Sequence, residues 1–162
     1  MTNPIRPTDN DARALAETLL QTARTASLAV LTSHGGPLVT RIAFGRTPDD
    51  QPLTLVSDLS AHTAALRSDP RCSLLVGDVT GKGDPLNQPR LTLEATASFL
   101  DRASPRHEEL AAHYLRDHPK SKLYIGFADF SFVLFTIKIG HLNGGFGKAF
   151  TLTPADLGCD AG

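Results

Sequence analysis

Two arginines, Arg41 and Arg46, stand five positions apart in the stretch TRIAFGR. Guanidinium groups bind phosphate through paired hydrogen bonds, so two of them on one element are candidates for an anion site. The stretch has the composition of a β-strand, in which residues five apart point to opposite faces. Both arginines can therefore serve one ligand only if a bulge or the strand end redirects Arg46. An isolated strand arginine is more often solvated or at an interface, so the pair needs support from a second feature.

The stretch SDLSAHT supplies that feature, because it ends one predicted strand and opens a predicted helix. Ser57, Ser60 and His62 lie at this junction. The first turn of a helix offers unpaired N–H groups and the positive end of the helix dipole to an anion. The alternative is that the serines cap the helix and bind no ligand. Taken with the arginines, however, they predict a phosphate-binding site.

The stretch GHLNGGFGKAF follows an apolar run and raises a different question. A tight turn explains two of its glycines, since glycine tolerates positive φ, but it leaves Gly147 without a reason. A backbone without Cβ atoms can also approach a flat ligand closely. We therefore predict that Gly145, Phe146 and Gly147 shape one wall of a cofactor pocket.

The two cysteines, Cys72 and Cys159, match no metal-binding or redox spacing. We expect both to be reduced and without a functional role, and we expect no metal site.

These residues must be positioned by short strands with few helices between them. The patterns predict helices at residues 11–24, after Ser60, and from Ser104 to the residue before Pro119. They also predict a hairpin around Gly35 to Pro37 and further strands at residues 53–57, from Cys72, at 90–99 and at 130–139. Strand 90–99 alternates apolar and polar residues, whereas strand 130–139 is apolar on both sides and should be buried on both faces.

Few crossover helices favour an antiparallel arrangement over a doubly wound parallel sheet. We predict a mainly β protein with helices (α+β), a six- to seven-stranded split β-barrel with peripheral helices. The 162 residues fit one domain, residues 1–162, with a core at about 12–152 and short flexible termini.

Charge and hydropathy exclude some classes of partner. With 16 Lys and Arg against 17 Asp and Glu, the net charge of −1 predicts no nucleic-acid partner. The sequence contains neither a signal-peptide pattern nor an apolar run of about 20 residues, so we expect a cytoplasmic protein that does not enter a membrane.

Four motifs in order, RIAFGR, SDLSAHT…SDPRCSLLV, HPKSKLYIGFADFSF and HLNGGFGKA, resemble the FMN-binding split-barrel proteins related to pyridoxamine 5′-phosphate oxidase. Within them, the chain resembles the branch that includes haem-utilisation proteins. The resemblance implies that Arg41, Arg46, Ser60 and His62 hold the FMN phosphate. It also implies a homodimer with two flavins at the subunit interface.

The chain departs from the oxidases themselves, since it has no Trp and lacks their C-terminal substrate-binding motif. Vitamin B6 oxidation is therefore not expected, and His62 stands where the oxidases have lysine. The leading hypothesis is an FMN-dependent oxidoreductase of unknown substrate. One alternative is a haem-binding or haem-utilisation protein with His113, His118 or His141 as ligand; another is a non-catalytic split-barrel dimer. A dimer is also expected because one barrel should cover only one face of strand 130–139.

Overall fold

The computed structural model describes residues 3–159. Residues 1–2 and 160–162, which are part of the expected flexible termini, lie outside this range. Regular structure runs from Ile5 to Leu157, which is wider than the predicted core of residues 12–152.

Strands dominate the described chain. There are nine of them within residues 3–159: β1 (Ile5–Arg6), β2 (Thr25–Leu31), β3 (Pro37–Ala43), β4 (Gly45–Arg46), β5 (Pro52–Ser57), β6 (Arg71–Val76), β7 (Arg90–Phe99), β8 (Phe130–Asn143) and β9 (Ala149–Leu152). The helices are α1 (Asn10–Thr22), α2 (Ala61–Ser68) and α3 (Pro105–Asp117), with short 3-10 turns η1 (Pro85–Asn87), η2 (Pro119–Leu123) and η3 (Ala155–Leu157). The α+β class is confirmed, and the prediction of six to seven strands missed the two-residue strands β1 and β4.

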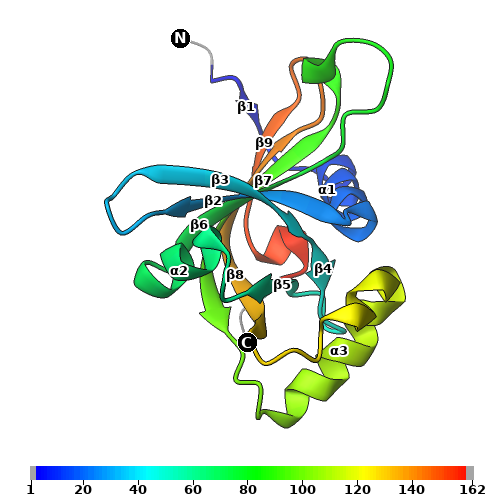
Figure 1. Cartoon of the computed structure of the whole chain (residues 1–162). Helices are drawn as coiled ribbons and strands as arrows, with labels where there is room; N and C mark the ends of the chain where they lie inside the picture. Colours follow the sequence, from blue (N-terminus) through cyan, green and yellow to red (C-terminus); the bar gives the residue numbers. More distant parts are fainter. Residues whose placement is uncertain (1–2, 160–162) are drawn as a thin grey trace.

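One continuous sheet bends around the core without closing (Figure 1). Its strand order is β1-β9-β8-β7-β6-β2-β3, and β5 also pairs with β8 and carries β4 on its other side. All pairings are antiparallel except the short contact of β1 with β9. This is the expected split barrel.

Local sequence signals fix the helices. Asp9 caps α1 by accepting a hydrogen bond from the Ala12 N–H at 2.8 Å. Ser104 caps α3 in the same way, and Pro105 occupies its first turn, where the missing N–H costs nothing. Ser60 holds the cap position of α2, but its side chain makes no capping hydrogen bond.

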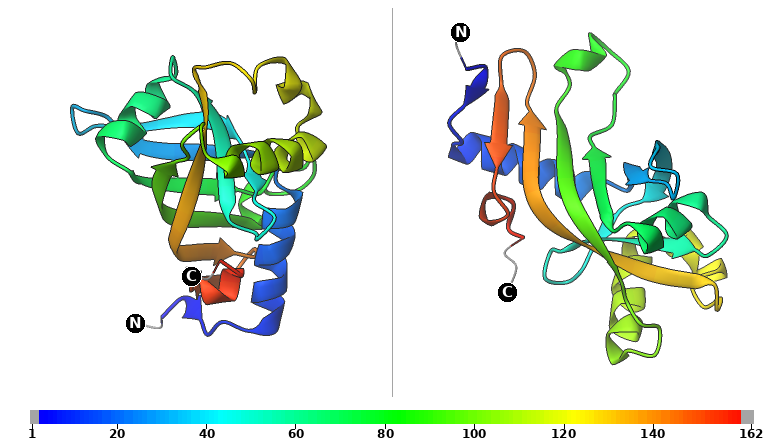
Figure 2. Two further views of the ribbon diagram at one scale, coloured as in Figure 1. Left: turned by 90° about the horizontal axis from the view of Figure 1, so that it is seen from below. Right: turned by 90° about the vertical axis from the view of Figure 1, so that its left-hand side faces the viewer.

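Two apolar clusters lie on opposite sides of the sheet. The larger one fills the barrel, where α1 and α2 bury residues such as Leu20 and Leu66 against the strands. The smaller one lies outside the barrel, where α3 covers β5 and the first half of β8 through Leu110 and Tyr114. Figure 2 shows α3 set apart from the other helices, near the start of β8.

Strand β8 is buried on both faces only over residues 131–135, and Thr136 and Lys138 beyond them are exposed. The expectation for residues 130–139 is therefore confirmed in its first half and wrong in its second. The chain's own α3 covers the second face, through contacts to Phe132 and Leu134. The argument that the second face needs a partner chain therefore does not apply to residues 131–135, and the homodimer itself stays a prediction.

Another part of the outer sheet surface has no helix over it. Directly paired residues of five strands form two rows across it: Arg41, Ser27, Leu75, Thr92 and His141 in one, and Val39, Ala29, Ser73, Glu94 and Ile139 in the other. None of these ten residues belongs to either apolar cluster. We call this surface the open face. No helix within residues 3–159 is long and apolar enough to cross a membrane.

Candidate functional site

The junction between β5 and α2 is organised by Ser57 and Asp129. The Ser57 hydroxyl donates to Asp129 Oδ2 at 2.9 Å and accepts from the Leu59 N–H at 3.1 Å. The Asp129 carbonyl accepts from the Asp58 N–H at 2.8 Å. Asp129, just before β8, therefore fixes the loop that leads into α2.

Ser60 and His62 lie one turn further on. His62 Nδ1 is 2.9 Å from Thr40 Oγ1 on β3, and this contact fixes the imidazole ring. Burial lowers the pKa of His62, because removal from water disfavours the charged imidazolium. The lowered pKa favours the neutral ring at pH 7.

The start of α2 has free hydrogen-bonding capacity. Within residues 3–159, the backbone N–H groups of Ala61 and His62 have no acceptor, and the Ser60 side chain does not cap the helix. These donors and the partial positive charge of the helix end suit a phosphate or carboxylate oxygen. The junction therefore brings Ser57, Ser60 and His62 together as the sequence predicted.

Arg41 points the other way. Side chains alternate along β3, so Thr40 faces α2 while Arg41 is exposed on the open face. There it lines a groove of about 300 Å³ with Ser27, Leu75 and Asp78. It has no hydrogen-bond or ion-pair partner within residues 3–159. The structure therefore does not bring Arg41 together with Ser60 and His62.

Arg46 is engaged within the chain. The strand breaks at Phe44, whose N–H bonds to the Arg24 carbonyl, so the condition for redirecting Arg46 is met. Its guanidinium contacts both carboxylate oxygens of Glu17, at 2.8 and 3.2 Å, and Asp50 Oδ1 at 3.5 Å. Only 11% of the side chain is exposed. A ligand at Arg46 would have to displace or share these carboxylates.

The glycine-rich turn between β8 and β9 lies far from α2. Gly145 (φ +119°) is buried, and a Cβ on it would come within 3.0 Å of the Asn87 carbonyl oxygen. Gly147 (φ +69°) would meet only Arg6, at 3.7 Å, and Phe146 is 93% exposed. Contact with the β6–β7 loop thus explains Gly145. Whether these residues contact a cofactor stays a prediction.

The candidate haem ligands differ in their contacts. His118 Nε2 is 2.8 Å from the Phe44 carbonyl, and its ring stacks on Tyr114 with the centroids 4.3 Å apart. His141 Nε2 is 2.5 Å from Glu94 Oε2 on the open face. His113, on α3, is half-buried. Among the described residues, no group of three or more His, Cys, Asp and Glu side chains is arranged to hold a metal ion.

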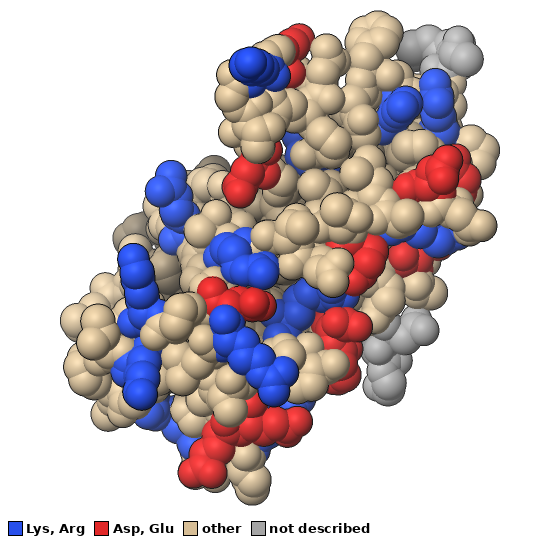
Figure 3. Space-filling view, turned by 90° about the vertical axis from the view of Figure 1, so that its right-hand side faces the viewer, with Lys and Arg blue, Asp and Glu red and all other residues tan. Residues whose placement is uncertain are grey.

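Cys72 belongs to the apolar cluster inside the barrel, and its neighbour Ser73 borders a second groove, of about 350 Å³, on the open face. The Cys72 thiol is 3.6 Å from the Ala95 carbonyl, and burial raises its pKa to about 12. Charges elsewhere are mixed: Figure 3 shows acidic and basic side chains interleaved over one face of the molecule.

The family model described as pyridoxamine 5′-phosphate oxidase matches residues 13–143. The chain belongs to the pyridoxamine 5′-phosphate oxidase family. The match spans the sheet from α1 to the end of β8 and includes the β5–α2 junction and Arg41.

Within the pyridoxamine 5′-phosphate oxidase family, the chain is similar to proteins named for haem. It is 32% identical to the non-canonical heme oxygenase HOZ, chloroplastic, of Arabidopsis thaliana over 72% of this chain and 35% of that protein. It superposes on a heme binding protein from Mycobacterium smegmatis with a TM-score of 0.82 and 27% identity, covering 95% of this chain and 61% of that one. Campylobacter jejuni ChuZ gives a TM-score of 0.82 at 20% identity, covering 95% and 63%. The chain thus spans about a third of its curated relative and about three fifths of these solved ones.

Two residues of the junction escaped the sequence analysis. Thr40 holds His62, and Asp129 holds Ser57, across 22 and 72 positions of sequence. Alternation along β3 puts Thr40 on the side opposite Arg41, but no local signal in the sequence links Thr40 to His62. Asp129 reads as an ordinary turn residue until the pairing of β5 with β8 brings it beside Ser57.

Proposed function

We propose that the protein is an FMN-binding flavoprotein, an oxidoreductase of unknown substrate, with flavin at the interface of a homodimer. The observation that carries the proposal is the cluster of unsatisfied donors at the start of α2, beside the ordered ring of His62. Such a cluster suits the terminal phosphate of FMN. The exposed Arg41, without a partner among the described residues, supplies positive charge from the open face.

Each residue has a stated task in this proposal. Ser60 and the first-turn N–H groups of α2 donate to phosphate oxygens, and Ser57 keeps the loop in shape through Asp129. His62 contributes a positive charge once the phosphate favours its protonation. Arg41 pairs with a further phosphate oxygen only if its side chain turns from the open face toward α2, and Arg46 does so only at the expense of its contacts to Glu17 and Asp50. When bound, flavin supplies the redox chemistry, and the chain supplies binding and orientation.

A comparison of FMN with riboflavin tests the phosphate site, because the two differ only in the phosphate. Apo-protein titrated with each ligand should bind FMN at least about 100-fold more tightly, since several charge-assisted hydrogen bonds depend on the phosphate. Equal affinities for FMN and riboflavin would refute the phosphate site. Absence of binding by both would refute the flavin proposal.

Haem binding is the second candidate, favoured by the names of the Arabidopsis and Mycobacterium relatives. His113 and His141 are the better ligand candidates, because the ring nitrogen of His118 already contacts a carbonyl. The absorbance spectrum of the freshly purified protein separates the hypotheses. Flavin bands support the main proposal and a Soret band supports the second. Neither, even after FMN and haem are added, would support the non-catalytic dimer.

A further inference from the structure

The imidazole ring of His62 is held through one of its two nitrogens. Nδ1 lies 2.9 Å from the hydroxyl oxygen of Thr40, which reaches it from β3. Nε2 has no hydrogen-bond partner within residues 3–159 and is open to solvent. The second residue of α2 therefore presents one fixed ring nitrogen to the protein and one unpaired ring nitrogen to a ligand.

The Thr40 hydroxyl favours one position for the proton of the neutral ring. Within residues 3–159 this hydroxyl has no partner other than Nδ1 of His62. If Nδ1 carried the proton, it would donate to Thr40 Oγ1, and the hydroxyl hydrogen would have no acceptor in this part of the chain. If Nδ1 carries no proton, the hydroxyl donates to it and both groups are satisfied. The second arrangement avoids an unpaired donor in a partly buried contact, so it places the proton on Nε2.

The same contact also serves the charged ring. When the imidazole is protonated, Nδ1–H donates to the Thr40 oxygen, because a hydroxyl group can both donate and accept. Nε2 therefore keeps its proton in both charge states of His62.

The backbone acceptors around the start of α2 are already occupied. The Ser57 carbonyl accepts from the Ser60 N–H at 3.1 Å and from the Thr63 hydroxyl at 2.6 Å. The Ser60 carbonyl accepts from the Thr63 N–H at 3.0 Å. The donors differ, since within residues 3–159 the backbone N–H groups of Ala61 and His62 have no acceptor. The junction thus has donors to spare and few acceptors.

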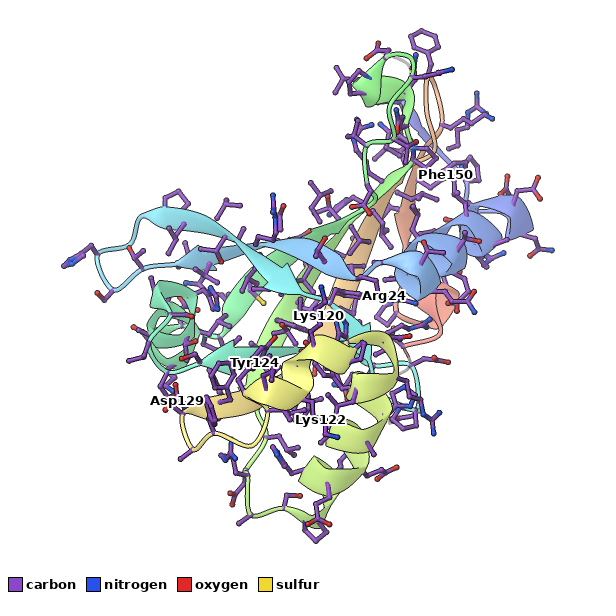
Figure 4. The ribbon with its side chains drawn as sticks, turned by 45° about the vertical axis from the view of Figure 1, so that its right-hand side comes forward. Arg24, Lys120, Lys122, Tyr124, Asp129 and Phe150 are labelled. Carbon is purple, nitrogen blue, oxygen red and sulfur yellow. The ribbon has the colours of Figure 1, made fainter. Side chains whose placement is uncertain are left out.

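The nearby carboxylates do not take up these donors. Asp58 pairs with Arg67 at 3.1 Å, and Asp129 accepts from the Ser57 hydroxyl at 2.9 Å. Figure 4 shows Asp129 close to α2, at the opposite end of the molecule from Phe150. Each of these acidic groups has a donor of its own, so the free N–H groups of α2 remain available to a ligand.

We propose that Thr40 is a positioning and specificity-determining residue of the anion site at the start of α2. By donating to Nδ1 it keeps a proton on Nε2, so the ring of His62 adds a donor, and not an acceptor, to the free N–H groups beside it. Such a cluster binds an oxygen that only accepts hydrogen bonds, such as that of an ionised phosphate, more tightly than a hydroxyl group, whose hydrogen would lack an acceptor. The inference rests on the proposed function, because it takes the start of α2 as the place where the ligand phosphate binds.

A purely structural role for Thr40 would be to tie α2 to β3. The helix is anchored without this contact, since Ala65 and Leu66 are buried in the barrel cluster and the Thr63 hydroxyl bonds to the Ser57 carbonyl. Thr40→Val removes the hydroxyl and keeps a β-branched residue in the strand, whereas Thr40→Ser keeps the hydroxyl. Comparison of the two variants therefore separates the hydroxyl from the strand.

Nitrogen NMR of the flavin-free protein tests the position of the proton directly. Correlations between the ring nitrogens and the carbon-bound ring protons distinguish protonated from unprotonated nitrogens in protein made with isotope-labelled histidine. The spectra are recorded at pH 8, above the lowered pKa of His62, and comparison with His62→Ala assigns the signals. We expect the proton on Nε2 in the native protein and in Thr40→Ser, and exchange between both nitrogens in Thr40→Val. A native ring with its proton on Nδ1 would overturn the proposal.

Titration with FMN and with riboflavin tests the consequence for the ligand. Thr40→Val should weaken FMN binding by about 5- to 10-fold, the effect of one hydrogen bond, and should leave riboflavin binding unchanged. Thr40→Ser should bind both ligands as the native protein does. Thr136→Val, at an exposed position on β8, is the matched control and should also behave as the native protein. Equal weakening of FMN and riboflavin by Thr40→Val would indicate a structural role and overturn the proposal.

A double-mutant cycle shows whether Thr40 acts through His62. In a His62→Ala background, Thr40→Val should have no further effect on FMN affinity, and a further loss of the same size would contradict the proposal. A protein with the expected ring tautomer that binds no FMN would reject the flavin and retain the positioning of His62 by Thr40. Native FMN affinity in Thr40→Val would reject the role of Thr40 and leave the flavin proposal intact.

Discussion

Arg41 is an exposed guanidinium on an otherwise weakly charged row of the open face, next to Ser27 and across from Leu75. Because no side chain among residues 3–159 pairs with Arg41, replacing Arg41 should change the free energy of unfolding little. The replacement should weaken the binding of a phosphate much more. Arg41→Ala should weaken FMN binding by about 2–4 kcal/mol, the scale of one lost charge-assisted contact.

Calorimetric or fluorescence titration of apo-protein with FMN measures this loss. Arg13→Ala is a suitable control, because Arg13 also has an exposed guanidinium but pairs with Asp156, far from α2 in sequence. Unchanged FMN affinity in Arg41→Ala would mean that the phosphate is held elsewhere.

His62 should make FMN affinity depend on pH. Its pKa in the free protein is below 6.5 because of burial, and a bound phosphate would raise that pKa. A pKa that rises on binding means that the added affinity is present at low pH and is lost as pH rises through the pKa of the complex. We expect binding to weaken by about 3- to 10-fold between pH 6.5 and pH 8.5.

The phosphate of FMN titrates near pH 6, so a matched variant must measure its contribution alone. His62→Lys keeps the positive charge throughout this range, so the pH dependence of its FMN affinity comes from the phosphate. A native protein with the same pH dependence as His62→Lys would show that His62 does not contact the phosphate.

At the scale of elements, the loops at residues 77–89 and 144–148 pack closely against each other. Gly145 has positive φ, and a Cβ there would press on the Asn87 carbonyl. Gly145→Ala should therefore lower the free energy of unfolding by about 1–3 kcal/mol, from backbone strain and the displaced contact together.

Gly147→Ala is the control, because Gly147 also has positive φ but has open space around its Cα apart from Arg6. It should cost about 1 kcal/mol or less, the backbone part alone. Chemical denaturation of both variants gives the comparison. Equal losses in the free energy of unfolding would mean that the contact between the two loops contributes nothing to stability.

The sequence predicted helices and strands more reliably than the tertiary contacts between them. Alternation of polar and apolar residues located β7, and Asp9, Ser104 and Pro105 located the ends of α1 and α3, because these signals are local. The coverage of β8 by α3 could not be read from the chain, since it depends on where a helix ending at Asp117 packs in space. The ion pair of Arg46 with Glu17, 29 positions away, could not be predicted from the sequence for the same reason.

At the scale of the whole molecule, two partly buried histidines should set its response to mild acid. Burial lowers the pKa of His62 and of His107, and nearby Arg102 lowers that of His107 further. In the unfolded chain both titrate near 6.5, so below that pH the unfolded state binds more protons than the folded state. The free energy of unfolding should therefore be highest above pH 6.5 and fall as the pH drops from about 6.5 to 5.

Two aspartates, Asp49 and Asp69, titrate in a separate, lower pH range. Hydrogen bonds from Arg71 lower the pKa of Asp69 to about 2, and a hydrogen bond from Thr47 lowers the pKa of Asp49, so both groups titrate below the pH range of the histidines. Urea unfolding of the apo-protein at a series of pH values should show the histidine slope alone between pH 6.5 and 5. Replacing both residues, His62→Gln with His107→Gln, should flatten it. A native profile without slope in this range would contradict the assignment.

Cys72 has a consequence for the chemical durability of the protein. With a pKa of about 12, its sulfur carries almost no thiolate at neutral pH, and the thiolate is the form that peroxide and alkylating reagents attack. A flavin that reacts with oxygen would release peroxide, which oxidises accessible thiolates. Because this thiol stays protonated against the Ala95 carbonyl inside the barrel, we expect the proposed chemistry to leave it unoxidised.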